Sequence, residues 1–235
     1  MPGRIELDRA QAHHLRGVLR LKQGDPVEAF DDAGNVAAAT IDRCEPAHVW
    51  LRIEHVGHVE QAGASGQIIV ASAIPRGERA DWMVEKLSEL GVWRFIPLLT
   101  ARSVVKPAGR NKIERWRRLA AEAAKQSRRI GVMQIDEPMP LDQALALLGS
   151  ASTAMFLSTQ PDAPSIASPS SFILHPSTFF LFIGPEGGWT EEEIGRFNAS
   201  GLTGVKLTGT ILRVETAALA AAAIVASGAA AQAAQ

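Results

Sequence analysis

The sequence FFLFIGPEGGWTEEEI, residues 179–194, decides the fold of this chain. An apolar run typical of a buried strand leads into a turn with three glycines in five residues. Thr190 then begins a helix, and Glu193 completes a capping box with it. A glycine-rich turn at the carboxyl end of a strand lets the backbone approach a ligand closely. The turn lacks the Walker A and Gly-x-Gly-x-x-Gly patterns, and its spacing alone fits an ordinary turn equally well.

Strand-like and helical segments alternate upstream and downstream of this turn, which favours an α/β domain with a mostly parallel sheet. We expect strands at residues 67–74, 93–99, 132–135, 153–157 and 178–183, and helices at residues 78–90, 112–129 and 141–148 and from residue 214 onward. The alanine-rich C-terminal helix is too weakly apolar for a membrane span. It is typical of a core helix or of a helix packed in a homodimer.

The first sixty residues have a different pattern. A short helical stretch from Asp8 to Leu15 precedes strand-like runs at residues 27–30, 36–41 and 49–53, with a hairpin turn at 31–35. This pattern predicts a small β domain of the barrel kind. Residues 57–66 are typical of a linker, so we expect domains at residues 1–62 and 67–235.

The composition excludes several classes of protein. The 235 residues include 24 Lys and Arg, 25 Asp and Glu, and 46% hydrophobic residues, which fits a globular chain and excludes a disordered or fibrous one. The single cysteine, Cys44, cannot form an internal disulfide, and the first residues lack the apolar core of a signal peptide. We therefore expect a cytoplasmic protein with no membrane anchor. No Cys, His or Asp spacing predicts a metal site.

The net charge of −1 conceals a strong segregation of charge. Residues 102–129 contain ten basic and two acidic side chains, whereas residues 130–235 contain three basic and nine acidic ones. A solvated helix face is the usual explanation of such a run. Most of these cations are arginine, however, which suits bidentate contacts with phosphate. We therefore expect RNA or another polyanion to bind this stretch.

Five motifs resemble, in the same order, those of the bacterial 16S ribosomal RNA uridine N3-methyltransferases, which belong to the SPOUT superfamily. They are HHLRGVLRLKQGD (13–25), ELGV (89–92) with IPLLTARSVVK (96–106), AAEAAKQSRR (120–129), GPEGGWTEEEI (184–194) and LTGTILRVETA (207–217). The resemblance covers almost the whole chain. It implies a PUA-like N-terminal domain, a SPOUT trefoil-knot domain and a homodimer. Family members usually have an arginine where this chain has Thr210.

The same resemblance implies S-adenosyl-L-methionine as the methyl donor, bound in the knot. One wall of the pocket would contain Leu157, Ile183, Gly184, Pro185, Glu186 and Gly188, and the other Leu207, Gly209, Ile211, Leu212 and Ala217. We expect Gly209 to mark a place without room for a side chain.

Methylation of uridine N3 requires removal of a proton or stabilisation of the resulting anion. Arg213 is the candidate for the anion, and Glu215 would orient Arg213 or accept the proton. Glu215 could instead simply stabilise the start of its helix, where a carboxylate is favoured. The candidate contacts to 16S rRNA are Arg16, Arg20, Arg102, Lys106, Arg118, Lys125 and Arg129.

Two other interpretations remain open. One is another knotted methyltransferase that acts, for example, on transfer RNA ribose, although the N-terminal motif favours the ribosomal group. The other is a non-enzymatic RNA-binding protein of the same fold. The intact turn at residues 184–188 and Gly209 disfavour the second interpretation.

Overall fold

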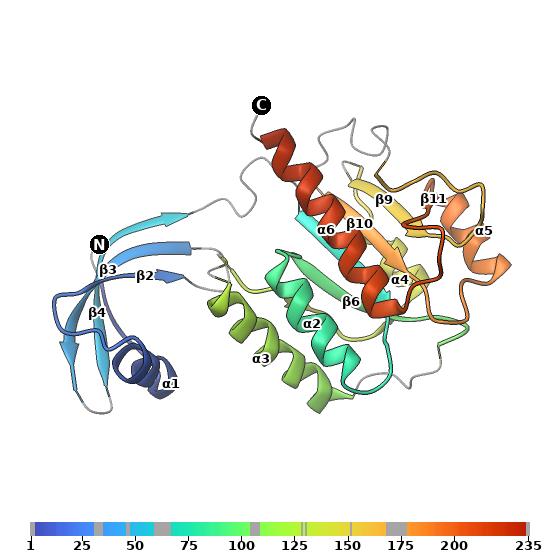
Figure 1. Ribbon diagram of the computed structural model, residues 1–235. Coiled ribbons are helices and arrows are strands. Elements are labelled where there is room, and N and C mark those ends of the chain that lie inside the picture. Colours follow the sequence, from blue (N-terminus) through green and yellow to red (C-terminus); the bar gives the residue numbers. More distant parts are fainter. Residues whose placement is uncertain are drawn as a thin grey trace. The chain divides into compact units, whose positions relative to one another are not determined.

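The chain divides into two compact units, Met1–Gln61 and Ala62–Gln235 (Figure 1). The computed structural model describes residues 3–30, 35–45, 48–58, 67–103, 109–127, 129, 131–150, 152–167 and 178–233. The hairpin turn at 31–34, most of the expected linker, and Lys106 lie outside the described residues.

The first unit contains a four-stranded antiparallel sheet in the order β1-β4-β3-β2. Its strands are β1 Arg4–Glu6, β2 Pro26–Phe30, β3 Asn35–Cys44 and β4 Val49–His58. Three of these strands are the predicted ones, and β1 was not predicted from the sequence. In the described residues the expected barrel takes the form of this single sheet, with register shifts in β3 that bend its pairing with β4.

A short helix covers one face of this sheet. Helix α1, Arg9–His13, begins at Asp8, whose carboxylate accepts a hydrogen bond from the Gln11 N–H at 2.8 Å. It continues into a π-helical segment, η1, His14–Val18. The core between helix and sheet contains Ala12, Ala39, Ile41, Val49, Leu51 and Ile53. Alternate residues of β4 therefore face this core, as the sequence pattern predicts.

The second unit is built on a parallel sheet in the order β11-β9-β10-β5-β6-β7, with β8 paired to β6. Its strands are β5 Gln67–Ala73, β6 Arg94–Leu99, β7 Gln134–Ile135, β8 Met139–Pro140, β9 Ser152–Leu157, β10 Thr178–Ile183 and β11 Thr203–Val205. Because every pairing in this sheet is parallel, the carboxyl ends of the strands meet at one edge. The α/β fold predicted from the sequence is confirmed.

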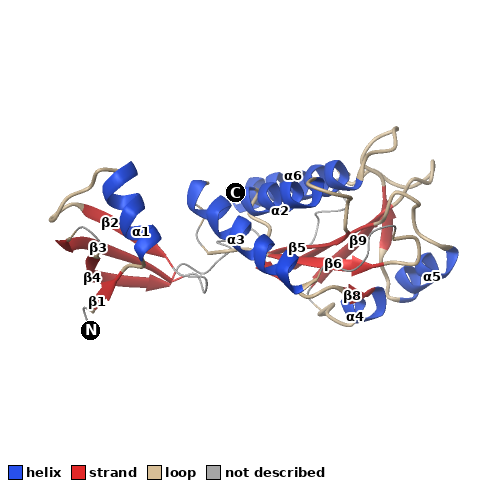
Figure 2. Ribbon diagram, turned by 90° about the horizontal axis from the view of Figure 1, so that it is seen from below, coloured by secondary structure: helices blue, strands red, loops and turns tan. Residues whose placement is uncertain are grey.

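Helices cover both faces of this sheet (Figure 2). One layer contains α2 Arg79–Glu89, α3 Arg110–Gln126 and α6 Val214–Ala233, and the other contains α4 Leu141–Leu145 and α5 Glu191–Ala199. Helix α2 is capped by Leu90 and followed by Gly91 with a φ of +84°, as the sequence predicts. No helix of the described part of the chain is long and apolar enough to cross a membrane.

Polar contacts join α2 to α3 inside the apolar core. Trp116 is fully buried, packs edge-on against Phe95, and donates its indole N–H to an oxygen of Asp81 at 2.7 Å. The Ser88 hydroxyl donates to the Ala120 carbonyl at 2.9 Å. These bonds satisfy polar groups in the core and fix the helix that carries most of the basic segment.

Candidate functional site

Three neighbouring strands end side by side at the carboxyl edge of the parallel sheet. Val205, the last residue of β11, pairs with Leu157, the last residue of β9. On the other side of β9, Phe156 pairs with Phe182, so β10 ends beside β9 at Ile183. The structure therefore brings together Leu157 and Ile183, two of the residues expected to line a cofactor pocket. Open α/β sheets bind ligands at this edge.

The glycine-rich turn after β10 is held by its own backbone and by Trp189. The Gly188 N–H donates to the Pro185 carbonyl at 2.8 Å, and Gly188 has a φ of +68°, in the left-handed region that favours glycine. Gly184 lies against the Trp189 indole, where an added Cβ would be 3.0 Å from Cε2. The indole N–H donates to the Leu157 carbonyl at 2.9 Å. Trp189 therefore links the turn to the end of β9.

The start of α5 confirms the predicted capping box and adds a contact that the sequence does not predict. The hydroxyl of Thr190 accepts from the Glu193 N–H at 3.2 Å, and Glu193 Oε2 accepts from the Thr190 N–H at 2.8 Å. Glu193 is buried, and its Oε1 accepts from the Ala101 N–H at 2.9 Å. One carboxylate thus joins the helix start to the loop after β6. No local sequence signal could indicate a bond between positions so far apart.

The predicted RNA contact Arg102 is also bonded to this turn. Its Nη1 donates to the Gly187 carbonyl at 2.8 Å and to the Trp189 carbonyl at 3.2 Å. The sequence placed Arg102 in the basic segment, and nothing in that pattern indicates a contact with the glycine-rich turn.

The second expected wall of the pocket follows β11. Lys206 is held on both sides of its peptide: its N–H donates to the Pro164 carbonyl at 2.9 Å, and its carbonyl accepts from the Ile166 N–H at 3.0 Å. The next residues turn locally, since the Thr208 hydroxyl accepts from the Thr210 N–H at 3.2 Å. Leu207 and Leu212 are half-buried against the core. Pro164–Ile166 therefore flank the start of this wall.

The expectation that the protein leaves no room beside Gly209 is wrong. A Cβ added at Gly209 would meet no atom within 4 Å, and its φ is not in the left-handed region. The side chain of Ile211, two residues later, is 83% exposed. The packing of this unit therefore does not require glycine at 209. Gly209 therefore presents bare backbone to open space, next to the exposed apolar side chain of Ile211.

The two candidate catalytic residues lie at the start of α6 in different surroundings. Arg213 is exposed, and its carbonyl accepts the Ala217 N–H at 2.8 Å in the first turn. The Glu215 side chain is only 8% exposed, and its Oε1 lies 3.8 Å from Nη1 of Arg79 on α2. The other oxygen, Oε2, is buried and has no hydrogen-bond partner among the described residues. The structure thus gives Glu215 a partner in Arg79, whereas the sequence suggested Arg213.

The basic residues of α3 do not all lie on one surface. Arg118 is exposed, and Lys125 is exposed beside Glu122, with 3.4 Å between Nζ and Oε1. Arg129 lies beyond the end of the helix and donates to the Ser88 carbonyl at 3.1 Å. Burial lowers the pKa of Arg129 to about 10. Its expected place on the exposed face of α3 is therefore wrong, because the helix ends before it and its guanidinium is largely removed from water.

Of the N-terminal candidates for RNA contact, Arg16 lies within η1 and Arg20 lies just after it. Arg16 is half-buried and donates to the Glu45 carbonyl at 2.7 Å. Arg20 is exposed and has a φ of +56°, unusual for a residue with a side chain. The two arginines therefore differ, since the Arg20 side chain is exposed while Arg16 is bonded to the backbone.

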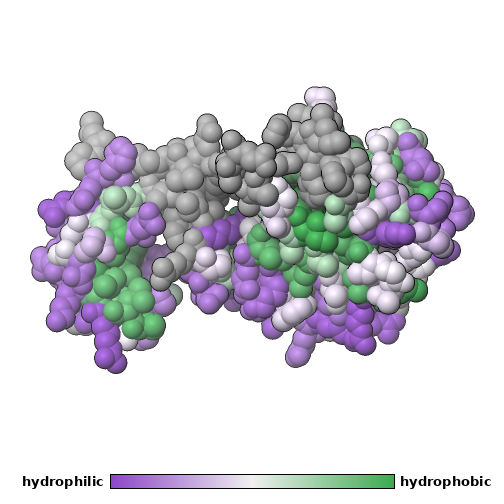
Figure 3. All heavy atoms as spheres, turned by 45° about the horizontal axis from the view of Figure 1, so that its top comes forward, coloured by the Kyte–Doolittle hydropathy of each residue, from purple (hydrophilic) through white to green (hydrophobic). Residues whose placement is uncertain are grey.

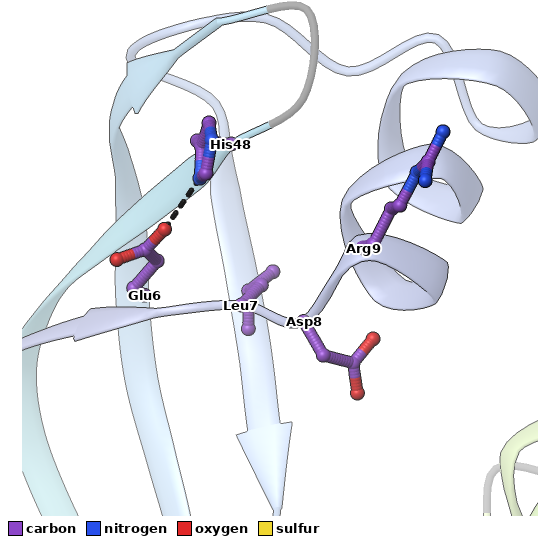
Figure 4. A pocket seen from close by; sticks show the side chains of 5 residues that line it. All are labelled: Glu6, Leu7, Asp8, Arg9 and His48. Carbon is purple, nitrogen blue, oxygen red and sulfur yellow. Dashed lines mark hydrogen bonds and ion pairs between the residues drawn. The ribbon is translucent and has the colours of Figure 1, made fainter.

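A shallow hollow of about 610 Å³ in the first unit is lined by Glu6, Leu7, Asp8, Arg9 and His48 (Figure 4). Glu6 and His48 point toward each other, with 2.5 Å between Oε1 and Nδ1. Asp8 is bonded to the start of α1. The polar groups of the hollow are thus largely engaged with one another and with the backbone. Within the described ranges, no group of three His, Cys, Asp or Glu side chains could hold a metal ion.

Comparison with known families and proteins agrees with this architecture. Residues 63–226 match the model of the RNA methyltransferase domain, and residues 7–53 match that of the RNA methyltransferase PUA domain. Ribosomal RNA small subunit methyltransferase E of Synechocystis sp. is 34% identical over 91% of this chain and 69% of its own length. The protein of the same name from Bacillus subtilis is 30% identical over 89% of this chain and 84% of its own length.

A solved structure gives the same result in three dimensions. The crystal structure of a ribosomal RNA small subunit methyltransferase E from Neisseria gonorrhoeae, bound to S-adenosyl methionine, aligns with a TM-score of 0.78 and 30% identity. The alignment covers 94% of this chain and 90% of that one. The parallel sheet, the glycine-rich turn and the two domain matches together define an RNA methyltransferase domain preceded by an N-terminal PUA domain. Within that class, the chain belongs to the ribosomal RNA small subunit methyltransferase E family.

Proposed function

We propose that this protein transfers a methyl group from S-adenosyl-L-methionine to N3 of a uridine in 16S rRNA. The observation that carries the proposal is the set of three neighbouring strand ends, with the glycine-rich turn following β10 and the loop that contains Gly209 following β11. A relative with 30% identity over nearly the whole chain was solved with S-adenosyl methionine bound. The identity of the substrate comes from the sequence motifs, which resemble those of enzymes that methylate uridine N3 in 16S rRNA. An intact small subunit, rather than isolated RNA, is the proposed substrate.

The residues at the carboxyl edge of the parallel sheet suit a cofactor that has an apolar face and polar groups able to bond to the protein backbone. One wall of the proposed pocket contains Leu157, Ile183, Gly184, Pro185, Glu186 and Gly188, and the other contains Leu207, Gly209, Ile211, Leu212 and Ala217. Apolar side chains and bare glycine backbone are the usual lining of such sites. When bound, S-adenosyl-L-methionine supplies a methyl group on a sulfonium centre, which is a good leaving group. A trefoil knot in this part of the chain is part of the same proposal.

Arg213 and Glu215 are the proposed catalytic residues. The exposed guanidinium of Arg213 would stabilise negative charge on a uracil oxygen as N3 loses its proton. We assign that proton to Glu215, because its Oε2 has no hydrogen-bond partner among the described residues. Arg79 would hold the opposite oxygen of the same carboxylate.

Measurement of methyl transfer to small subunits tests these roles. With saturating cofactor, we expect Arg213→Ala and Glu215→Gln each to lower the rate about a hundredfold, the usual size of a general acid–base or electrostatic contribution. Circular dichroism would check that both variants fold. Near-normal rates in both would contradict the assignment and leave Glu215 as a residue that only stabilises the start of its helix.

Exposed cations are the proposed contacts to ribosomal RNA. Arg20, Arg118 and Lys125 are exposed. Lys106 remains a candidate from the sequence. Arg16, Arg102 and Arg129 are weaker candidates, because their guanidinium groups are bonded to backbone carbonyls.

A homodimer formed through α6 is also proposed. Figure 3 shows apolar side chains gathered on one face of the second unit, the face on which α6 lies in Figure 1. The outward side of the helix contains Thr216, Leu219, Ala220, Ala223, Ile224 and Ser227, with no charged side chain. Small and apolar residues in such a stripe allow close packing of a second, symmetry-related helix. A ribosomal substrate and the lone cysteine support a cytoplasmic location.

Calorimetry with S-adenosyl-L-methionine separates this proposal from a binding protein that does no chemistry. We expect the wild-type chain to bind the cofactor and Gly209→Ala to bind at least tenfold more weakly, with an unchanged melting temperature. The melting temperature is the control, because the protein itself leaves room for the new methyl group. Absence of binding by the wild-type chain would favour the non-enzymatic alternative. Methylation of ribose instead of N3 would favour the other knotted methyltransferases.

A further inference from the structure

Residues 100–103, directly after β6, form a hydrogen-bonded turn that contacts the glycine-rich turn. Within it, the Ser103 N–H donates to the Thr100 carbonyl, and the Thr100 N–H donates to the Ser103 hydroxyl, each at 3.1 Å. The two hydroxyls are 2.7 Å apart. Thr100 and Ser103 thus close a turn around the two residues between them. Those two residues, Ala101 and Arg102, make all of the bonds from this loop to the glycine-rich turn and α5 described above.

Arg102 contacts the middle of the turn with both its polar end and its aliphatic stem. One guanidinium nitrogen donates to the carbonyls of Gly187 and Trp189, at 2.8 and 3.2 Å. A Cβ added to Gly187 would lie 3.2 Å from Cβ and 3.3 Å from Cδ of Arg102. The stem of the arginine would therefore crowd a side chain at 187. Close approach of Arg102 favours glycine at 187, whereas the left-handed φ favours glycine at 188.

We propose that Arg102 is a positioning residue that holds the glycine-rich turn in its cofactor-binding shape, and that it is not primarily an RNA contact. Without Arg102, the carbonyls of Gly187 and Trp189 would lose their donor, and among the hydrogen bonds of the described residues the Gly188 to Pro185 bond would be left to hold the centre of the turn. Trp189 and Glu193 fix the two ends of the turn, so its middle is the part that depends on Arg102. The inference rests on the proposed function, because it assumes that this turn binds S-adenosyl-L-methionine.

A double-mutant cycle on Arg102 and Gly187 tests the inference in the full-length chain. Calorimetry with S-adenosyl-L-methionine should show about tenfold weaker binding for Arg102→Ala, the loss that one charge-assisted hydrogen bond produces. Arg102→Lys keeps the charge, but its ammonium ends one bond short of the position of Nη1, and we expect it to bind about as weakly. Gly187→Ala should also weaken binding, because its methyl group collides with the stem of Arg102. In the Arg102→Ala background that collision is gone, so the double variant should bind no more weakly than Arg102→Ala alone.

Arg110→Ala is the matched control, because Arg110 is an exposed arginine at the start of α3 and no bond joins it to the turn in the described structure. It should bind the cofactor like the wild-type chain. Wild-type affinity in Arg102→Ala, or losses that simply add in the double variant, would overturn the inference. Loss of affinity for a 16S rRNA transcript with unchanged cofactor binding would instead assign Arg102 to the RNA surface.

The same cycle distinguishes failure of the inference from failure of the proposed function. If the wild-type chain did not bind S-adenosyl-L-methionine, the proposed function would fail, and the positioning role in cofactor binding would fail with it. The coupling between Arg102 and Gly187 can then still be measured by denaturant unfolding of the four proteins. If the wild-type chain binds and Arg102→Ala binds equally well, only the positioning role fails.

Discussion

Gly184 lies against the indole of Trp189, which leaves almost no space for a methyl group on its α-carbon. Gly187 is crossed by Arg102, and Gly188 has a left-handed backbone. A different physical cause therefore favours glycine at each of these three neighbouring positions. The sequence predicts a turn from their spacing, but it cannot distinguish these reasons, since two of them depend on side chains whose place is set by the fold.

Gly184→Ala should lower the free energy of unfolding by about 1–3 kcal/mol, the usual cost of overpacking a tight site. Trp189 cannot move aside easily, because its N–H is bonded to the Leu157 carbonyl and its ring packs on Phe197. Denaturant unfolding measures the effect. Gly195→Ala is the control: Gly195 is exposed within α5 and has open space, so the change should stabilise the chain by up to about 1 kcal/mol. Equal effects of the two changes would contradict this account.

The ion-pair partner of Glu215 could not be predicted from the sequence. Its position beside Arg213 in the sequence suggested that the two act together, yet the structure turns it toward Arg79 in the layer of α2. Successive residues near a helix start point in different directions, so sequence neighbours need not share a partner. The packing of α6 beside α2 decides the partner, and no local pattern in the sequence contains that information.

At the scale of elements, the sequence predicts most of the second unit. Strand β10 has the expected bounds, and α3 buries Ile113, Trp116, Ala120 and Ala123 as its period indicates. The end of α3 differs, because the helix stops at Gln126 and leaves Arg129 in a half-buried position. Periodicity identifies a buried face well, whereas it locates helix ends poorly when no glycine or proline marks them.

Glu193→Ala should destabilise the chain by about 2–3 kcal/mol, because it leaves the N–H groups of Ala101 and Thr190 without their acceptor. Thr190→Ala removes only the helix cap and should cost about 1 kcal/mol. Glu191→Ala, in the same exposed first turn, should cost less than about 1 kcal/mol through its interaction with the helix dipole. Thermal or denaturant unfolding gives the order. A loss for Glu193→Ala no greater than that for Glu191→Ala would show that the bond to Ala101 contributes nothing.

For the whole molecule, a formal net charge of −1 suggests a protein that does not bind nucleic acid. The segregation of charge along the chain corrects that impression, and the structure refines it further. Several cations of the basic segment are bonded within the protein, and others, such as Arg118, are exposed without a described partner. A count of charges therefore overestimates the surface available to phosphate.

The salt dependence of RNA binding distinguishes these two groups of cations. Arg118→Ala should reduce the slope of log affinity against log salt by about 1, the effect of one lost phosphate contact. Arg117→Ala is the matched control, because Arg117 is already held by Glu114 and by the Ile135 carbonyl. Its slope should stay close to that of the wild-type chain. Filter binding of a 16S rRNA transcript over a range of salt gives both slopes, and equal reductions would contradict the distinction.

The oligomeric state tests the apolar side of α6. Ala223→Glu places a charge in the middle of the proposed dimer contact, so light scattering should show the mass of a monomer in place of a dimer. Gln143→Glu, on the exposed side of α4, is the control and should leave the dimer intact. An unchanged mass for Ala223→Glu would place the interface elsewhere, and a monomeric wild-type chain would remove it.

Nucleoside mass spectrometry measures methylation of uridine N3 in 16S rRNA itself. We predict that 16S rRNA from cells lacking this protein lacks one 3-methyluridine, and that the wild-type gene restores it whereas Arg213→Ala does not. Unchanged 3-methyluridine in the deletion strain would contradict the account.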